Sequence, residues 1–108
     1  MVMIEKIKSE DADFLIKAFM SLETAEEYYR FLDDICTVAE IREMSKRLKA
    51  AKMLKSKAVY SDVAKATGLS TATISRVSRC LKYGSDGYGI ALDRIAGGVK
   101  AEKTDGQK

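Results

Sequence analysis

Residues 60–81 read YSDVAKATGLSTATISRVSRCL and carry the side chains with the most suggestive chemistry in the chain. Within this stretch, Ile74, Val77 and Leu81 are spaced three and four apart, which would place them on the inward face of a helix. The positions between them carry hydroxyl, methyl and guanidinium groups. Short side chains let a helix approach the major groove closely, and arginine can bond two acceptors on guanine. The stretch therefore predicts a helix that binds DNA.

The outer face of this predicted helix carries neither acidic nor bulky side chains. Arg76 and Arg79 are the expected base or phosphate contacts. Thr71 and Thr73 lie near the helix N-terminus, where anions bind most favourably. Ser78 is assigned to the same outer face. The full set of expected DNA-binding residues is Thr71, Ala72, Thr73, Ser75, Arg76, Arg79 and Lys82. A structural helical hairpin with an exposed polar face is the alternative.

The same stretch fits two short helices that cross at a steep angle, so a helix-turn-helix is expected over about residues 60–81. Gly68 stands where the chain must turn sharply, a position that favours a residue able to adopt positive φ. Leu69 is expected to pack the turn into the core. Either Ser70 or Thr71 can cap the second helix.

The charge of the chain is distributed unevenly along its length. Residues 46–82 contain 10 basic and 1 acidic side chains, a balance of +9. Residues 1–45 contain 5 basic and 11 acidic side chains, a balance of −6, and residues 83–108 contain 4 of each. One basic block in an otherwise acidic or neutral chain is typical of a surface that meets phosphates. A solvated, lysine-rich helix face would produce the same count, so charge alone leaves both readings open.

Enzyme, metal and membrane functions are not expected. The chain contains no histidine, which removes the commonest general base, and no paired-carboxylate motif is evident. Cys36 and Cys80 are isolated, so both are interpreted as small core residues and neither a zinc site nor another cofactor is expected. No apolar run approaches the roughly 20 residues that cross a bilayer, and the first ten residues lack a secretory signal. These features favour a cytoplasmic protein.

The fold is expected to be all-α, with one domain over residues 1–98 and a disordered tail over 99–108. Helices are predicted at about 11–22, 24–35, from the capping box Thr37-Val38-Ala39-Glu40 to about Ser56, and at 87–96. The third of these is expected to face the core with Ile41, Met44, Leu48, Ala51 and Leu54.

The two N-terminal helices carry more apolar residues than the short C-terminal helices of one chain could cover. Both apolar stripes are interpreted as core, and a partner chain is expected to bury what one chain cannot. The residues that predict a homodimer are Phe14, Phe19, Tyr28, Phe31 and Ile35.

Three strings in residues 28–94 resemble the tryptophan-repressor-like family, and most closely its YerC/YecD branch. They are RLKAAKML at residues 47–54, TATISRVSRCL at 71–81 and YGSDGY at 83–88. The resemblance implies an all-helical fold in which two chains interlock through their N-terminal helices. It also implies that the two helix-turn-helix units are displayed on one side of the dimer.

The resemblance further implies a possible effector pocket formed by Thr37, Arg47, Arg76 and Val77. In the tryptophan repressor a glycine at the position of Val77 admits the indole ring. Since a branched side chain should fill that space, tryptophan is not expected as a corepressor. Whether another small molecule acts here stays open. Outside such a pocket, Thr37 would serve as a helix cap and Arg47 as a phosphate or ion-pair partner.

Together these features predict a sequence-specific transcriptional regulator, expected to be a repressor, that binds double-stranded DNA as a homodimer through its helix-turn-helix. The alternative is a helical protein-interaction module without DNA binding. An interaction surface would carry apolar or aromatic anchors, whereas the predicted outer face carries threonine, serine and arginine.

Overall fold

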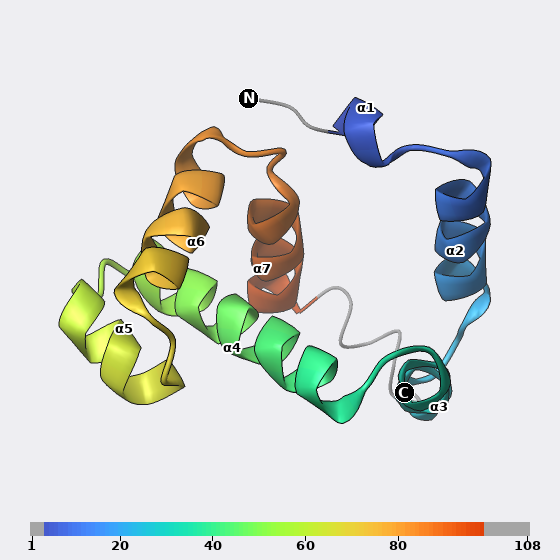
Figure 1. Ribbon diagram of the computed structural model, residues 1–108, viewed down its shortest axis with the longest axis horizontal. Helices are drawn as coiled ribbons and strands as arrows, with labels where there is room; N and C mark the ends of the chain where they lie inside the picture. The colour runs from blue at the N-terminus through green and yellow to red at the C-terminus, as the bar shows by residue number, and fades with distance from the viewer. Residues whose placement is uncertain (1–3, 99–108) are drawn as a thin grey trace.

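The computed structural model describes residues 4–98, which form helices and no strand (Figure 1). This confirms the all-α prediction. The helices are α1 (Ile4–Ile7), α2 (Glu10–Ser21), α3 (Ala25–Ile35), α4 (Val38–Lys55), α5 (Tyr60–Thr67), α6 (Thr71–Tyr83) and α7 (Gly87–Gly97). The tail predicted to be disordered, residues 99–108, lies outside the described residues. None of the helices in the described part is long and apolar enough to cross a membrane.

Side-chain caps fix where most of the helices begin. Thr37 accepts a hydrogen bond from the backbone N–H of Glu40, and the Glu40 carboxylate accepts one from the backbone N–H of Thr37. This is the capping box predicted from the sequence, and it starts α4. Ser9 and Thr24 cap α2 and α3 through one side-chain bond each. The short helix α1 was not predicted.

The core lies among the four C-terminal helices, and α4 is the element that the other three share. All the substantial helix contacts of the described chain are among α4, α5, α6 and α7. Ala50 and Ala51 of α4 are fully buried, and side chains this small let the neighbouring helices pack close to its backbone. The buried apolar residues are Ala50, Ala51, Val63, Leu69, Ile74 and Val77.

The helices α2 and α3 contain no buried residue, so the prediction that their stripes form a core was wrong for a single chain. Phe19 and Phe31 pack edge to face with ring centroids 5.2 Å apart, which joins the two helices to each other. Figure 1 shows α1–α3 standing to one side of the α4–α7 body. Their outer surfaces therefore stay open, and Phe14 is 75% exposed.

Two further predictions about the core need correction. Met44 and Leu48 are 43% and 38% exposed, because the buried positions of α4, Ala50 and Ala51, lie in its C-terminal half. Apolar spacing indicates which positions of a helix share a face, but not how far along that face a neighbouring helix packs. Cys36 is only half-buried and Cys80 is exposed, so neither is a core residue.

Candidate nucleic-acid interface

The turn between α5 and α6 has the geometry predicted for a helix-turn-helix. Gly68 ends α5 with φ +75°, and its backbone N–H donates to the carbonyl of Ala64 at 2.8 Å. This left-handed conformation is one that glycine adopts without steric cost. Leu69 follows with 8% exposure, so it packs the turn into the core as expected.

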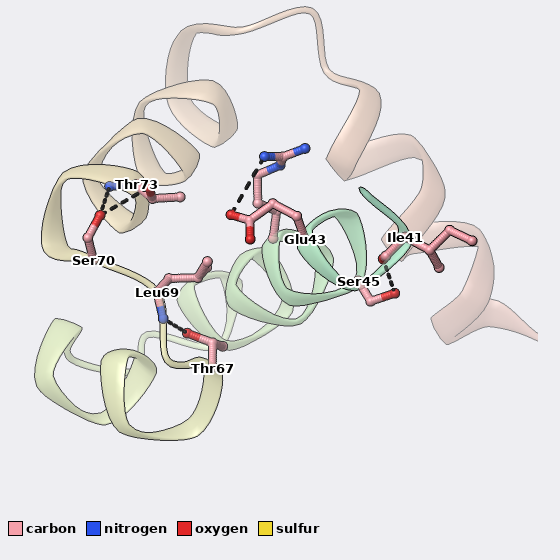
Figure 2. A network of polar contacts seen from close by, with 8 residues as sticks. Ile41, Glu43, Ser45, Thr67, Leu69, Ser70 and Thr73 are labelled. Carbon is pink, nitrogen blue, oxygen red and sulfur yellow. Dashed lines mark hydrogen bonds and ion pairs between the residues drawn. The ribbon is translucent and has the colours of Figure 1, made fainter. Parts of the chain in front are cut away.

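The start of α6 is set by Ser70, one of the two caps that the sequence allowed. Its hydroxyl oxygen accepts a hydrogen bond from the backbone N–H of Thr73 and its hydroxyl donates to Thr73 Oγ1, both at 3.1 Å (Figure 2). Thr71 is therefore the first helical residue and its side chain is exposed. Thr73 is half-buried and its hydroxyl is already engaged, which leaves it less available to a ligand than Thr71.

Packing fixes which face of α6 points outward. Ile74 is fully buried and Val77 is 2% exposed, so the inward stripe is as predicted. Ser78 is 8% exposed, and its assignment to the outer face was wrong because it lies one position from Val77 on the buried side. Of the predicted contact residues, the structure leaves these exposed on one helix: Thr71, Ala72, Ser75, Arg76, Arg79 and Lys82.

The two arginines are the most distinctive charges on this face. Arg76 and Arg79 are three residues apart, a spacing that makes them neighbours on a helix surface. Within residues 4–98 neither forms an ion pair. Both guanidinium groups are therefore available to an acidic partner.

The residues of the predicted effector pocket are not gathered at one point of a single chain. Thr37 and Arg47 are ten positions apart on α4, about 15 Å along its axis. The Thr37 hydroxyl caps the helix. Arg47 lies 3.9 Å from the Glu43 carboxylate, the ion pair marked by the dashed line at Glu43 in Figure 2. Arg76 is exposed, whereas Val77 is buried in the core.

Arg47 also lies beside Tyr88 of α7, a relationship that no sequence pattern indicated. Burial raises the pKa of the Tyr88 hydroxyl, and the Arg47 guanidinium opposes this shift through its charge and a hydrogen bond. Arg47 therefore links the middle of α4 to the start of α7. Sequence reasoning also missed the role of Thr67, whose hydroxyl donates to the Val63 carbonyl and accepts from the Leu69 N–H. The bond to Leu69 forms only when the turn has folded.

Comparison with known proteins agrees with this geometry. The family model described as "Trp repressor protein" matches residues 10–96. The uncharacterized protein YerC of Bacillus subtilis (strain 168) is 48% identical over 92 residues, which cover 85% of this chain and 88% of YerC.

Two solved structures are also similar. A candidate Trp repressor from Staphylococcus aureus is 47% identical, with a TM-score of 0.81 over 86% of this chain and 93% of the other. A TrpR-like protein from Eubacterium eligens ATCC 27750 is 44% identical, with a TM-score of 0.81 over 85% and 95%. On these matches, the chain belongs to the Trp repressor family and, within it, to the branch that contains YerC.

Proposed function

We propose that this chain is a homodimeric transcriptional regulator that binds specific sequences of double-stranded DNA through α6 and acts as a repressor. The observation that carries the proposal is the outer face of α6. It presents Arg76, Arg79 and short hydroxyl side chains to solvent while Ile74 and Val77 anchor the opposite face in the core. A helix held this rigidly can place side chains against base edges.

The charge of the surrounding helices supports the same function. Residues 46–82, from the middle of α4 to the end of α6, carry the +9 balance, and their one acidic residue is Asp62 of α5. Lysines in this block would neutralise backbone phosphates, and arginines of α6 would read bases. Repression, as opposed to activation, is supported by the names of the family and of the Staphylococcus aureus relative.

Dimerisation is proposed from the open apolar surface of the N-terminal helices. Phe14, Met20 and Tyr29 are each at least 75% exposed in one chain. Large apolar side chains clustered on adjacent helices are ordinarily buried by a partner, and a twofold arrangement would bury the same surface on both chains. The dimer would also place two copies of α6 on one side, about 34 Å apart if they read half-sites one turn of DNA apart.

Selection of bound duplexes from a random DNA pool tests this proposal directly. We expect enrichment of a roughly palindromic sequence, since two related recognition helices read two half-sites. Gel shifts of the selected duplex against a scrambled duplex, at one stated salt concentration, would then give the specificity ratio. Recovery of no preferred sequence would contradict sequence-specific binding.

A protein-interaction module is the second candidate, and one observation favours it. A cleft of about 770 Å³ lies between the end of α6 and the start of α7, and Tyr83, Tyr88 and Ala91 contribute to its lining. Aromatic residues around a cleft are typical anchors for a protein partner. DNA selection separates the two candidates, because an interaction module would enrich no sequence.

A further inference from the structure

A separate polar cleft of about 530 Å³ lies where the end of α4, the start of α5, the second half of α6 and the start of α7 meet. Its polar and charged lining residues are Lys55, Lys57, Tyr60, Ser78, Lys82, Asp86 and Asp93. The cleft has no part in the predicted effector pocket, and of the predicted DNA contacts it includes only Lys82.

The hydroxyl of Ser78 is the unusual group in this cleft. Ser78 is 8% exposed, yet its Oγ forms no hydrogen bond within residues 4–98. Ser45 donates to the carbonyl of Ile41 at 2.8 Å, whereas the hydroxyls of Ser61 and Ser75, which form no hydrogen bond in this range, are exposed to solvent. A buried hydroxyl without a partner is costly, so a free one that lines a cleft points to a ligand.

The charges around Ser78 favour an anion. Lys57 and Lys82 form no ion pair within the described chain, whereas Lys55 is paired with Asp93. Asp86 lies at the N-terminus of α7, where the helix dipole stabilises its carboxylate. The three lysines and two aspartates of the lining leave a balance of +1, and the ammonium groups of Lys57 and Lys82 are the ones not held in an ion pair within residues 4–98.

The start of α5 adds backbone donors. Val59 is the N-cap of α5 and makes no side-chain cap hydrogen bond, so no side chain satisfies the first N–H groups of this eight-residue helix. Tyr60, the first residue of α5, lines the cleft. A helix N-terminus beside two lysines and a buried hydroxyl forms a suitable set of donors for a tetrahedral oxyanion.

We propose that this cleft binds a phosphate group, held by the Ser78 hydroxyl, the Lys57 and Lys82 ammonium groups and the start of α5. The group could belong to a free phosphate ester or to the backbone of bound DNA, and its chemistry is the same in both cases. The inference does not depend on the proposed function, because a phosphate site can be measured without DNA.

Titration of the full-length, isotope-labelled chain with inorganic phosphate, at constant ionic strength, tests the site by NMR. We expect saturable shifts at the amides of Lys57, Tyr60 and Ser78. Ser78→Ala and Lys57→Asn should each weaken phosphate binding about tenfold, the effect of losing one charge-assisted hydrogen bond. Asparagine suits position 57 because Lys57 has φ +72°. Lys17→Ala, which removes an exposed lysine of α2 outside the cleft, should leave phosphate binding unchanged.

Thermal unfolding of the variants shows whether a loss of phosphate binding comes from a folding defect. Ser78→Ala should be at least as stable as the parent, because it removes a buried hydroxyl that has no partner. Shifts that do not saturate, equal phosphate affinity in the parent and both cleft variants, or a clear loss of stability in Ser78→Ala would overturn the proposal.

Gel shifts distinguish the two sources of phosphate. If the occupant is a free phosphate ester, Ser78→Ala and Lys57→Asn retain the DNA affinity of the parent. If it is a backbone phosphate, both variants bind DNA more weakly, and Lys57→Asn reduces the salt slope by about 1. If the parent protein does not bind DNA, the proposed function fails, while the phosphate titration still decides this inference.

Discussion

The hydroxyl of Thr67 connects the end of α5 to the turn that follows it, because it accepts a hydrogen bond from the backbone N–H of Leu69 at 3.2 Å (Figure 2). The same hydroxyl donates to the carbonyl of Val63 at 2.8 Å. Thr67 is 6% exposed, so water does not readily replace these bonds. The bond to Leu69 fixes the direction in which the chain leaves Gly68 and enters α6. This buried hydroxyl therefore helps to set how α6 follows α5.

Removal of this hydroxyl should destabilise the protein. Thr67→Val keeps the shape of the side chain but leaves the Leu69 N–H without a partner, at a cost of about 1–3 kcal/mol in the free energy of unfolding. Thr67→Ser keeps the hydroxyl and loses one methyl group, a cost of about 0.8 kcal/mol. Chemical denaturation of both variants measures the difference. A valine variant as stable as the serine variant would show that these hydrogen bonds do not stabilise the turn.

Sequence reasoning found the features that depend on local geometry. The capping box at Thr37 and the turn at Gly68 each depend on a few neighbouring residues, and both were predicted correctly. Ser78 was misplaced because it borders the buried stripe of α6, and three-four spacing does not define the edge of a buried face. The neighbouring helices decide that edge.

The N-terminal helices show a different limit of sequence reasoning. Their apolar spacing predicted buried faces, but no residue of α2 or α3 is buried in the single chain. The contact between Arg47 and Tyr88 was also out of reach, since the two residues are 41 positions apart and lie on different helices. Contacts between distant helices follow from packing, which a single sequence does not reveal.

Dimerisation should depend on the exposed apolar side chains of α2. Light scattering coupled to size exclusion should report twice the 11.9 kDa chain mass. Phe14→Glu should shift the population towards monomer, because a charge would have to be buried at the interface. Lys65→Glu, at an exposed position of α5 outside the N-terminal helices, serves as the control and should stay dimeric. A monomeric parent at micromolar concentration would contradict the dimer.

The protein should not use tryptophan as a corepressor. Val77 is 2% exposed, and its branched side chain is expected to occupy the space that a ligand beneath α6 would need. Calorimetry with L-tryptophan up to millimolar concentration should therefore show no saturable binding. Val77→Gly should gain binding, at a cost of about 1 kcal/mol in helix propensity and a further 1.5–3 kcal/mol in lost burial.

Two results would contradict the steric argument at position 77. Saturable tryptophan binding by the parent, with a tighter DNA complex, would show that a pocket exists despite Val77. Absence of binding by a folded Val77→Gly variant would show that another group excludes the ligand. Circular dichroism of the variant establishes that it is folded.

Lys82 should contribute to DNA affinity without contributing to sequence preference. Its ammonium group lies on α6 one turn beyond Ser78, and a phosphate contact there would be the same for every sequence. Lys82→Ala should weaken binding to selected and scrambled duplexes by equal factors and reduce the salt slope by about 1. Weaker binding to the selected duplex alone would instead assign Lys82 to base recognition.

The central claim is that the outer face of α6 reads DNA sequence, and the affinity of arginine variants for the selected duplex tests it most directly. If Arg76 or Arg79 bonds a guanine, its replacement by alanine should cost about 1–3 kcal/mol and relax the preference at one base position. Arg30→Ala, which removes an exposed arginine of α3, should bind like the parent. If Arg76→Ala and Arg79→Ala both retain full affinity and selectivity in the same gel shifts, α6 is not the recognition helix.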